Sequence, residues 1–534
     1  MMPLNRKEWL TAGQLKIIRR WIENGACEYK PGHRAGPRNL LETDFPSARQ
    51  CAGCHPKQYA EWSRSMHAYA QHSPVFEGFN LTLVERSEGT IGTFCSRCHS
   101  PLGTILGENA SRRNAHRSQL SMEGVSCVVC HRRAKAQYKS SGLTTIEPGA
   151  ASTSCMYGPF ENSVSHQAGA HKSQASSYLL SSQFCGECHD VTSPQGVRLE
   201  EAFSEWTTSH AARQGVTCQH CHMGPEQGVP IARDQRPLGR AAKVPGIKPE
   251  QLPLRRLSDH TFAGPDYSLL PDTEFPHKLD WMYETDYRDT TKLTPHQQGT
   301  LIQLRRDNRR HLEIARQKRY EVLRNAARLR VSHPGSAMAG EKAPVRVHVQ
   351  NLIAGHNLPT GFTAERQVWV SVQLFDPHGR LAFSSGDLDA NGDLRDEHSH
   401  AVLAGRLPWD RHLMNLQNKF VVPTHKGTER STALSINRHL SPLNVLRPAT
   451  ILSASQGRSA GLRLAKASLP PLGSREKNYS VVMPRQSGVY HLHVRLNFRH
   501  LPPALLDHVG TPHLKSALEV VMLQEYHGKI VIGH

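Results

Sequence analysis

Ten of the twelve cysteines fall into five Cys-x-x-Cys pairs, and a histidine directly follows each pair. In chain order the motifs are Cys51, Cys54 and His55; Cys95, Cys98 and His99; Cys127, Cys130 and His131; Cys185, Cys188 and His189; and Cys218, Cys221 and His222. With 33 histidines in 534 residues, five such placements would arise by chance about once in a million, if positions were independent. This repeat constrains both the ligand and the fold.

Three chemistries use Cys-x-x-Cys pairs. Zinc ribbons need two pairs for each metal, usually about 15–20 residues apart, whereas here the gaps are longer and an odd number of pairs cannot be divided into twos. Redox dithiols use one exposed pair at the start of a helix. Covalent haem attachment accounts for the whole motif, because both sulfurs form thioethers to the porphyrin and the adjacent imidazole binds the iron. The sequence therefore predicts five c-type haems, with zinc as the alternative.

The sequence segments around the motifs resemble those of a known family. They read YAEWSRSMHA, FCSRCHSPLG, GVSCVVCHR, SSQFCGECHD, EWTTSHAARQGVTCQHCHMG and DHTFAGPDYS, over about residues 48–280. They are similar to multihaem cytochromes c related to the tetrahaem carrier that takes electrons from hydroxylamine oxidoreductase. The later segment NLIAGHNLPTGF resembles one that often follows such domains. The resemblance implies electron transfer through closely packed haems, mostly with histidine on both faces of the iron.

Five irons need up to five further ligands on their second faces. His67 follows Tyr59, Trp62 and Met66 at helical spacing and stands at the family's distal position, and the resemblance also implies a distal role for His171, which precedes the fourth motif. The predicted distal set is His67, His171, His210, His260 and His356. His166 is the alternative to His171, and the reserves are His72, His116 and His277.

The assignment of His210, His260 and His356 as distal ligands depends on their local sequence context. His260 follows all the motifs and lies in a segment with no obvious packing role. His356, in AGHNLPTG, would reach back from the C-terminal part to bind a haem iron. For His356 the alternative is a loop histidine that bonds to its own turn. His210 repeats the opening stretch, because Trp206 and Ser209 stand where Trp62 and Ser65 do. The sequence predicts all three as ligands.

Methionine is the other usual sixth ligand and raises the reduction potential relative to histidine. Met66, Met122, Met156 and Met223 lie near the motifs, but none has a spacing that favours it, so we expect them to pack against porphyrin faces. Bis-histidine ligation predicts low-potential haems. Cys27 and Cys155 belong to no motif; we expect two buried thiols, with a disulfide as the alternative.

The N-terminal stretch, residues 1–30, has a helical pattern with Gly25 as a stop signal. Its apolar face is formed by Leu10, Leu15, Ile18, Trp21 and Ile22. It resembles the last helix of a single-haem cytochrome c domain, although no motif precedes it. No secretory signal and no apolar run of about 18 residues is visible. Since this haem attachment occurs outside the cytoplasm, we expect a true start further upstream and a periplasmic or extracellular protein that does not span a membrane.

The chain is expected to be α+β and multidomain. Residues 31–290 hold all five motifs and are rich in Gly, Pro, Ser and His, so we expect a mainly helical domain of short helices and long loops with haems as its core. Residues 291–340 contain a predicted long helix at 294–331. Residues 341–534 alternate with period two in VRVHVQNL, QVWVSVQLF, NYSVVM, VYHLHVRLNF and LEVVMLQEY, which predicts an antiparallel β-sandwich-like domain.

The formal net charge is +19. Ten haem propionates would cancel about ten of these charges and leave a moderately basic protein, suited to acidic redox partners or other cytochromes. The segment from Arg305 to Arg330 contains ten Lys/Arg and only three Asp/Glu. This excess of positive charge indicates either a solvated helix face or a docking surface for an acidic partner. No recognition-helix or RNA-binding motif is present, so nucleic-acid binding is not expected.

The leading interpretation is a non-catalytic electron carrier, so no catalytic residue is assigned. The alternative is a multihaem oxidoreductase acting on a small nitrogen or sulfur compound at one five-coordinate haem, since the second and third motifs have no clear distal partner. Pentahaem nitrite reductases place lysine at the catalytic motif and hydroxylamine oxidoreductases use eight haems, and neither pattern fits. The C-terminal domain could also anchor the chain in a larger electron-transfer assembly or array.

Overall fold

The computed structural model describes residues 11–15, 40–133, 136, 140–152, 154–161, 163, 170–193, 198–270, 276–426, 430–435 and 463–533. The chain divides into two units, Met1–Asn39 and Leu40–His534. Within the predicted N-terminal helix only residues 11–15 are described, and there Leu15 N donates to Thr11 O at 2.9 Å. Its other named positions, Leu10, Ile18, Trp21, Ile22 and Gly25, lie outside the described residues, as do Cys27 and His166.

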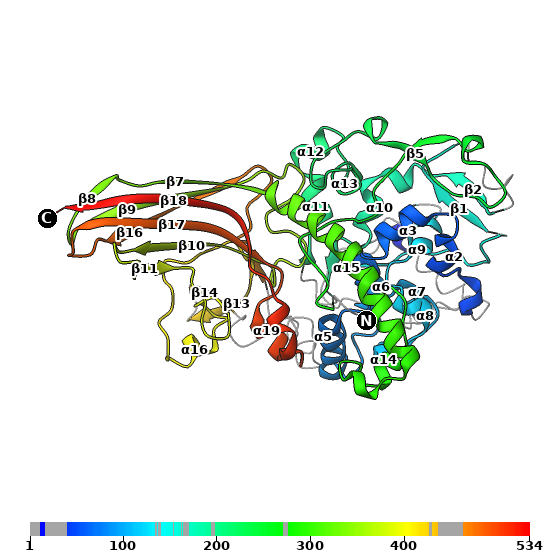
Figure 1. The fold of residues 1–534 in the computed structure, drawn as a ribbon, viewed down its shortest axis with the longest axis horizontal. Helices are drawn as coiled ribbons and strands as arrows, with labels where there is room; N and C mark the ends of the chain where they lie inside the picture. Colours follow the sequence, from blue (N-terminus) through cyan, green and yellow to red (C-terminus); the bar gives the residue numbers. More distant parts are fainter. Residues whose placement is uncertain are drawn as a thin grey trace. The chain divides into compact units, whose positions relative to one another are not determined.

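Short helices joined by loops make up residues 40–293 (Figure 1). The longest is α5 (Pro74–Arg86), which begins where the Ser73 side chain accepts a bond from Phe76 N. The other α-helices are α2 (Ala48–Ala52), α3 (Pro56–Trp62), α4 (Met66–Tyr69), α6 (Ser96–His99), α7 (Pro101–Ile105), α8 (Gln119–Met122), α9 (Cys127–His131), α10 (Ser182–Gly186), α11 (Ala202–Thr207), α12 (His210–Arg213), α13 (Cys218–His222) and α14 (Trp281–Glu284).

The same region holds single 3₁₀ turns and two-stranded ribbons. The turns are η1 (Glu42–Asp44), η2 (Asn114–His116), η3 (Tyr178–Leu180), η4 (Arg233–Gln235), η5 (Pro249–Gln251) and η6 (Thr290–Lys292). The ribbons pair β1 (Cys155–Gly158) with β2 (Lys172–Ala175), β3 (Val191–Thr192) with β4 (Arg198–Glu200), and β5 (Leu238–Arg240) with β6 (Leu254–Arg256). Elements this short cannot bury much apolar surface against one another.

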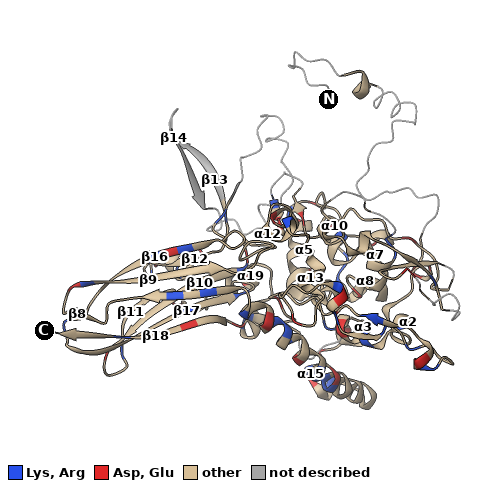
Figure 2. Ribbon diagram, turned by 90° about the horizontal axis from the view of Figure 1, so that it is seen from above, with Lys and Arg blue, Asp and Glu red and all other residues tan. Residues whose placement is uncertain are grey.

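A long helix, α15 (Pro295–Arg324), follows. Thr294 and Gln297 form a capping box at its start, and Pro295 occupies the first turn, where its missing N–H costs nothing. The predicted helix at 294–331 extended too far, because β7 (Ala327–Ser332) begins three residues after Arg324. Lys and Arg residues occur along α15 (Figure 2). No described helix is long and apolar enough to cross a membrane.

The C-terminal part contains two main sheets. One has the order β16 (Ser474–Val482), β9 (Lys342–Asn351), β7. The other has the order β11 (Leu381–Ser385), β10 (Gln367–Phe375), β17 (Gly488–Arg499), β18 (Val521–Gly533), β8 (Ser336–Met338), with β12 (Met414–Asn415) also on β10. All these pairs are antiparallel except β18 with β8. A smaller sheet joins β14 (Arg430–Ser435), β13 (Lys419–Lys426) and β15 (Arg463–Ala465).

The two main sheets share one hydrophobic core. Val345, Val347 and Val349 of β9 are all fully buried against it. On β17 the apolar positions of the period-two pattern also face inward, namely Tyr490, Leu492, Val494, Leu496 and Phe498. Helices in the first part and sheets in the second confirm the α+β class. The β domain starts earlier than predicted, with β7 at residue 327 rather than at 341.

The C-terminal part also packs against the helical part. Two elements, α19 (Pro503–His508) and η7 (Pro512–Ala517), follow β17. A short helix, α16 (His400–Leu403), lies earlier in the chain, between β11 and β12. Leu505 and Val509 share a cluster with Val75 and Leu83 of α5. A Cβ at Gly78 would lie 2.4 Å from the Val509 carbonyl oxygen, so the close approach of these segments requires glycine.

Candidate cofactor site

One cavity of about 1370 Å³ runs through the helical part and is lined by the cysteines and histidines of all five motifs. Most of the other lining residues are apolar, among them Trp62, Phe79 and Leu252. The β domain completes the wall with His356, Phe362 and other residues. The short helices thus surround a space that side chains do not fill, as expected for a domain with a bound cofactor at its core.

The spacing of each motif places its histidine one helical turn beyond the first cysteine. His55 N donates to Cys51 O at 2.7 Å, and His189 N donates to Cys185 O at 2.9 Å. An i to i+4 bond of this kind puts both side chains on the same face of the turn. This local geometry explains why the histidine must follow the second cysteine directly.

Backbone carbonyls orient four of the five motif imidazoles through Nδ1. The bonds run from His55 to Ala241 O at 2.7 Å, from His99 to Ala70 O at 3.1 Å, from His131 to Tyr157 O at 2.7 Å and from His222 to Ala263 O at 3.1 Å. A carbonyl oxygen only accepts, so Nδ1 carries the proton. Nε2 then keeps its lone pair and is free to bind a metal.

Three pairs of imidazoles face each other across the cavity. The ring centres are 6.3 Å apart for His55 and His171, 6.1 Å for His67 and His189, and 6.3 Å for His222 and His356. Two metal–nitrogen bonds of about 2.0 Å, with each ring centre about 1 Å beyond its nitrogen, require about 6 Å. The pairs therefore fit an iron between two imidazoles, in each case with one predicted distal histidine.

A fourth pair is indicated by burial and electrostatics. His131 and His260 both line the cavity, and His260 Nδ1 donates to Ser258 O at 3.2 Å. Burial, followed by the proximity of His131, lowers the pKa of His260 to about 4. Burial likewise lowers the pKa of His67 to about 3 and that of His356 to about 4. All three imidazoles are therefore neutral near pH 7, which is the form that binds iron.

His99 of the second motif differs from the other four. Its ring stacks on Phe76, with centres 3.8 Å apart and planes 4° apart. Among the described residues, no histidine ring contacts it as in the three measured pairs. The second motif thus has a proximal imidazole and, in the described part of the chain, no histidine opposite.

The structure does not support the prediction of His210 as a ligand. Trp206 Nε1 donates to Val216 O at 2.8 Å and Val216 N to Ala211 O at 2.9 Å, which repeats the bonds of Trp62, Val125 and His67. Ala211 therefore corresponds to His67, and His210 corresponds to Met66. A shift of one residue rotates a helical side chain by about 100°, so His210 is exposed while Ala211 lines the cavity.

The reserve histidines do not line the cavity. His116 is exposed, and His72 is buried. Both ring nitrogens of His277 are engaged, with Glu123 at 3.2 Å and with Tyr59 Oη at 2.7 Å.

Of the methionines predicted to pack against porphyrin, Met66, Met156 and Met223 line the cavity, and Met122 does not. Cys155 is half-buried rather than buried as expected. Cys27 lies outside the described residues, so the alternative of a disulfide between the two cysteines stays a prediction.

Several of the motif thiols are poorly suited to zinc. Burial raises the pKa of Cys95 to about 12 and those of Cys130 and Cys221 to about 11, whereas zinc binds the thiolate. Where the chain is described, the one group of three potential metal ligands within 4.8 Å of each other contains no cysteine. Four-thiol cages are therefore not formed there, and the apolar cavity fits a porphyrin better.

Motif sulfurs from distant parts of the chain also meet. Contacts join Cys51 to Cys127, Cys98 to Cys188 and Cys185 to Cys218, and Cys130 acts electrostatically on Cys185. The first motif thus neighbours the third, and the fourth motif neighbours the second, third and fifth. The field of His189, which acts on both His99 and His222, agrees with this order.

Sequence reasoning missed His500. It directly follows β17, is 7% exposed and lines the cavity, and its Nδ1 has no hydrogen-bond partner in the described part of the chain. Its ring contacts Tyr267, with centres 4.5 Å apart. Burial lowers its pKa to about 4. The only sequence signal is a histidine after a strand pattern ends, which is too weak to single it out among 33.

Comparisons with known proteins agree with this geometry. Residues 50–132 match the family of cytochrome c554 and c-prime. The structure resembles the crystal structure of a penta-heme cytochrome c552 from Thermochromatium tepidum, with a TM-score of 0.53, 16% identity, and coverage of 91% of this chain and 99% of that chain. No curated protein sequence matches.

A second structural match carries no argument. It is the CARDB domain of a Pyrococcus furiosus protein, at 11% identity over 39% of this chain and 87% of that chain, with a TM-score of only 0.13. The conclusion therefore depends on the matched family, the shared fold of the first structure, and the cavity with its paired imidazoles. The family match over residues 50–132 and the fold shared with a penta-heme cytochrome support a multihaem cytochrome c, and the cytochrome c family implies covalently bound haem c with its iron.

Proposed function

We propose that the chain is a five-haem electron carrier that passes single electrons between redox partners outside the cytoplasm. The observation that carries the proposal is the set of imidazole pairs 6.1–6.3 Å apart across one cavity. Such spacing leaves a coordinated iron no site for a substrate, so it suits electron transfer rather than bond chemistry.

The proposed ligands follow from the geometry. The ten motif cysteines bind the porphyrins, and His55, His99, His131, His189 and His222 are the proximal ligands. His171, His260, His67 and His356 then face His55, His131, His189 and His222, respectively. Bound haem c supplies a one-electron couple of its iron. The protein holds each imidazole in one orientation and excludes water, so that little rearranges when the charge changes.

The contacts between motif sulfurs suggest the route of the electron. The first, third and fourth motifs are successive neighbours, and the second and fifth both adjoin the fourth. The haem of the fourth motif would therefore be a branch point with two exits. The basic surface and α15 favour acidic protein partners or other cytochromes, and haem attachment of this kind favours a periplasmic or extracellular location.

A second candidate function concerns the second motif. Because no described histidine faces His99, its haem could bind a small nitrogen or sulfur compound at iron. Cys95 of this motif packs against a cluster that includes Tyr267 and Leu501, and Tyr267 contacts the buried His500. This motif thus has a titratable side chain nearby, as an oxidoreductase site requires.

Spectroscopy of the purified protein tests both functions. Haem analysis should give five haems for each chain, and electron paramagnetic resonance should show four low-spin haems and one high-spin haem. Fewer than four low-spin haems would contradict the carrier proposal. If all five are low-spin and unaffected by nitrite, hydroxylamine or sulfite, the second candidate fails while the carrier proposal stands.

A further inference from the structure

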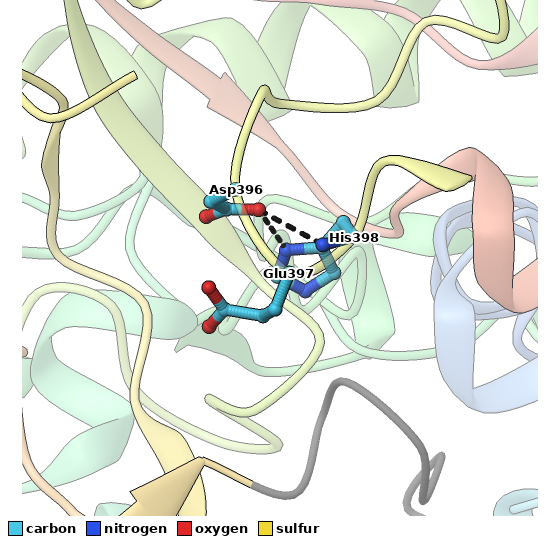
Figure 3. Close-up of side chains that lie close together, drawn as sticks. All are labelled: Asp396, Glu397 and His398. Carbon is cyan, nitrogen blue, oxygen red and sulfur yellow. Dashed lines mark hydrogen bonds and ion pairs between the residues drawn. The ribbon is translucent and has the colours of Figure 1, made fainter. Parts of the chain in front are cut away.

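The buried polar cluster of the β domain, Asp396, Glu397 and His398, is satisfied by its own neighbours (Figure 3). Asp396 Oδ1 accepts from His398 Nδ1 at 2.7 Å, and Gln417 Nε2 lies 3.2 Å from His398 Nε2. Lys419 Nζ pairs with Glu397 Oε1. Both ring nitrogens are thus engaged and this cluster is structural, whereas the surface over the first haem motif has side chains that are not engaged in this way.

The ribbon of β5 and β6 carries two apolar side chains on its outer face. Leu238 and Leu254 are 56% and 55% exposed, whereas Arg255, on the opposite face, lines the haem cavity. An arginine lies opposite each leucine in the register, Arg256 opposite Leu238 and Arg240 opposite Leu254. The two leucines are therefore diagonal neighbours on one face, about 7–8 Å apart. A small apolar patch with a polar rim is typical of an interaction site.

Basic residues surround this patch. Residues 228–258 contain seven Lys/Arg and only two Asp/Glu. Lys243 and Lys248, in the loop that joins the strands, and Arg256 are exposed, and none of the three forms an ion pair within the described part of the chain. An apolar centre within a rim of one charge suits a transient protein interface, because the charges steer the encounter and the apolar contact holds it.

The first haem motif lies directly behind the ribbon. Lys243 N donates to Cys54 O at 2.7 Å, and Ala241 O accepts from His55 Nδ1 at 2.7 Å. Ala241 and Val244 also line the haem cavity. The loop after β5 therefore orients the proximal imidazole on its inner side, and a protein bound to the outer side would be separated from the first haem by one layer of chain.

The first motif also lies at an end of the haem order. Its Cys51 contacts Cys127 of the third motif, and among the described residues no contact joins it to a sulfur of the second, fourth or fifth motif. A haem at the end of such an order must exchange electrons with a partner, whereas an interior haem can exchange them with its neighbours. A carrier of this kind therefore needs a docking surface next to its first haem.

We propose that the ribbon face, formed by Leu238, Arg240, Leu254 and Arg256 with Lys243 and Lys248 of the joining loop, docks an acidic redox protein that exchanges single electrons with the first haem. This inference rests on the proposed carrier function. In the transfer, one electron leaves the reduced partner and a ferric haem iron becomes ferrous, while no bond forms or breaks.

Charge complementarity favours this partner over other occupants. A second copy of the chain is disfavoured, because its formal net charge is also +19. Two leucines offer too little apolar surface to hold the chain on a membrane. A small interface is normal for electron-transfer encounters, in which the partners must separate again after each electron.

Reduction of the full-length, haem-loaded protein by a flavodoxin of net negative charge tests the proposal. Each flavin hydroquinone gives one electron to a ferric haem and becomes a semiquinone, and stopped-flow absorbance follows the ferrous haem. At low ionic strength, the second-order rate constant should be about tenfold lower in K243E/K248E than in the native protein. Salt should slow the native protein strongly and this variant only weakly. L254S should slow the reaction by about threefold without changing its salt dependence, because it removes only apolar contact.

R309E/R310E on α15 is the matched control. Arg309 and Arg310 are exposed, and the double substitution changes the net charge by the same amount as K243E/K248E. It should slow the reaction with flavodoxin by no more than about twofold, through the field of the whole protein alone. Dithionite is a small reductant that needs no docking, and it should reduce every variant as fast as the native protein.

Equal flavodoxin rates in the native protein and K243E/K248E would overturn the proposal. So would a loss in R309E/R310E as large as that in K243E/K248E, which would assign docking to α15 or to no single surface. Binding to phosphatidylglycerol vesicles, or a dimer, that is lost in L254S would assign the ribbon face to a membrane or to a second copy instead. The carrier function is measured separately, because uptake of fewer than five electrons from dithionite contradicts five haems without altering the comparison of the variants.

Discussion

At the scale of single residues, a hydrogen bond from Nδ1 to a backbone carbonyl orients most of the proposed haem-ligand imidazoles. His55 donates to Ala241 O and His171 to Lys172 O, the latter at 3.0 Å, so both rings present Nε2 toward the same point. His356 does the same through Asn357 O at 3.0 Å. These bonds fix the tautomer, and they favour these histidines over other nearby imidazoles as the proposed distal ligands.

Replacing one distal ligand should therefore change one haem. We expect His171→Ala to convert one low-spin haem to high-spin, and His171→Met to raise one reduction potential, because thioether ligation favours the ferrous state. The shift should be a fraction of the range of about 0.8 V that axial ligands span. Electron paramagnetic resonance and a redox titration measure both. His210→Ala is the control and should leave all haems unchanged; a change there would restore His210 as a ligand.

At the scale of elements, close approaches and ion pairs join the helical part to the β domain. Gly78 on α5 is in contact with Val509 after α19, and Asp266 pairs with Arg366 at 2.5 Å. His356 and Glu205, whose carboxylate accepts from Asn357 N at 3.0 Å, add a further connection. The β domain is therefore part of the cofactor site and more than an appended module.

We expect Gly78→Ala to destabilise the protein by about 1–3 kcal/mol, because the added methyl group meets a backbone oxygen that cannot turn away. Gly299→Ala on α15 is the control, since nothing lies within 4 Å of its Cβ, and it should stabilise by about 0.5–1 kcal/mol. Denaturant unfolding measures both. Equal effects of the two substitutions would show that α5 and the C-terminal segment are not in such close contact.

The pair of Asp266 and Arg366 predicts a pH dependence. Burial alone would raise the pKa of Asp266, but the Arg366 guanidinium outweighs it and lowers the pKa below its ordinary value. A depressed carboxyl pKa stabilises the fold above the unfolded value of about 3.9, and this stability is lost as pH falls through the folded pKa.

Asp266→Asn should therefore flatten the loss of stability below about pH 4. At pH 7 it should cost about 1–3 kcal/mol, less than a fully buried pair, because the Arg366 and Asp266 side chains keep 20% and 31% of their surface exposed. Unfolding followed from pH 3 to pH 7 measures this. An unchanged acid limb in the variant would contradict the assigned ion pair.

At the scale of the whole molecule, the two parts have different kinds of core. The β domain is filled by side chains from both sheets, such as Val347, Val370 and Leu492, all fully buried. The helical part has a cavity of about 1370 Å³ where a side-chain core would otherwise lie. Its stability should therefore depend on the cofactor, and that of the β domain should not.

Expression without haem attachment tests this difference. Limited proteolysis of the haem-free chain should degrade residues 40–293 and leave a resistant fragment that begins near β7, because an unfilled apolar cavity cannot offset the entropy of ordering short helices. The haem-loaded chain should resist over its whole described length. Equal protection of both parts without haem would contradict the view that porphyrin forms the core.

How much of this could be predicted from the sequence depends on the range of each interaction. The motifs and the strands were recognisable because a helical turn and a period of two are local patterns: Cys51 to His55 spans one turn, and Val345 to Val349 alternates on one strand. The structure does not support the prediction of His210 as a ligand, because the sequence repeat was aligned one residue out of phase. Only the shared hydrogen bonds reveal that Ala211 corresponds to His67. The proposed branch at the fourth motif had no sequence signal.

By itself, the sequence predicted a covalently bound haem cofactor, five attachment motifs and the α+β class, because each depends on residues a few positions apart. Only the tertiary structure decided which histidine faces which motif, that His99 has no described counterpart, and that His500 and Glu365 line the cavity. Those relations join residues more than a hundred positions apart, and such distances are set by how the chain packs around the cavity rather than by any local period.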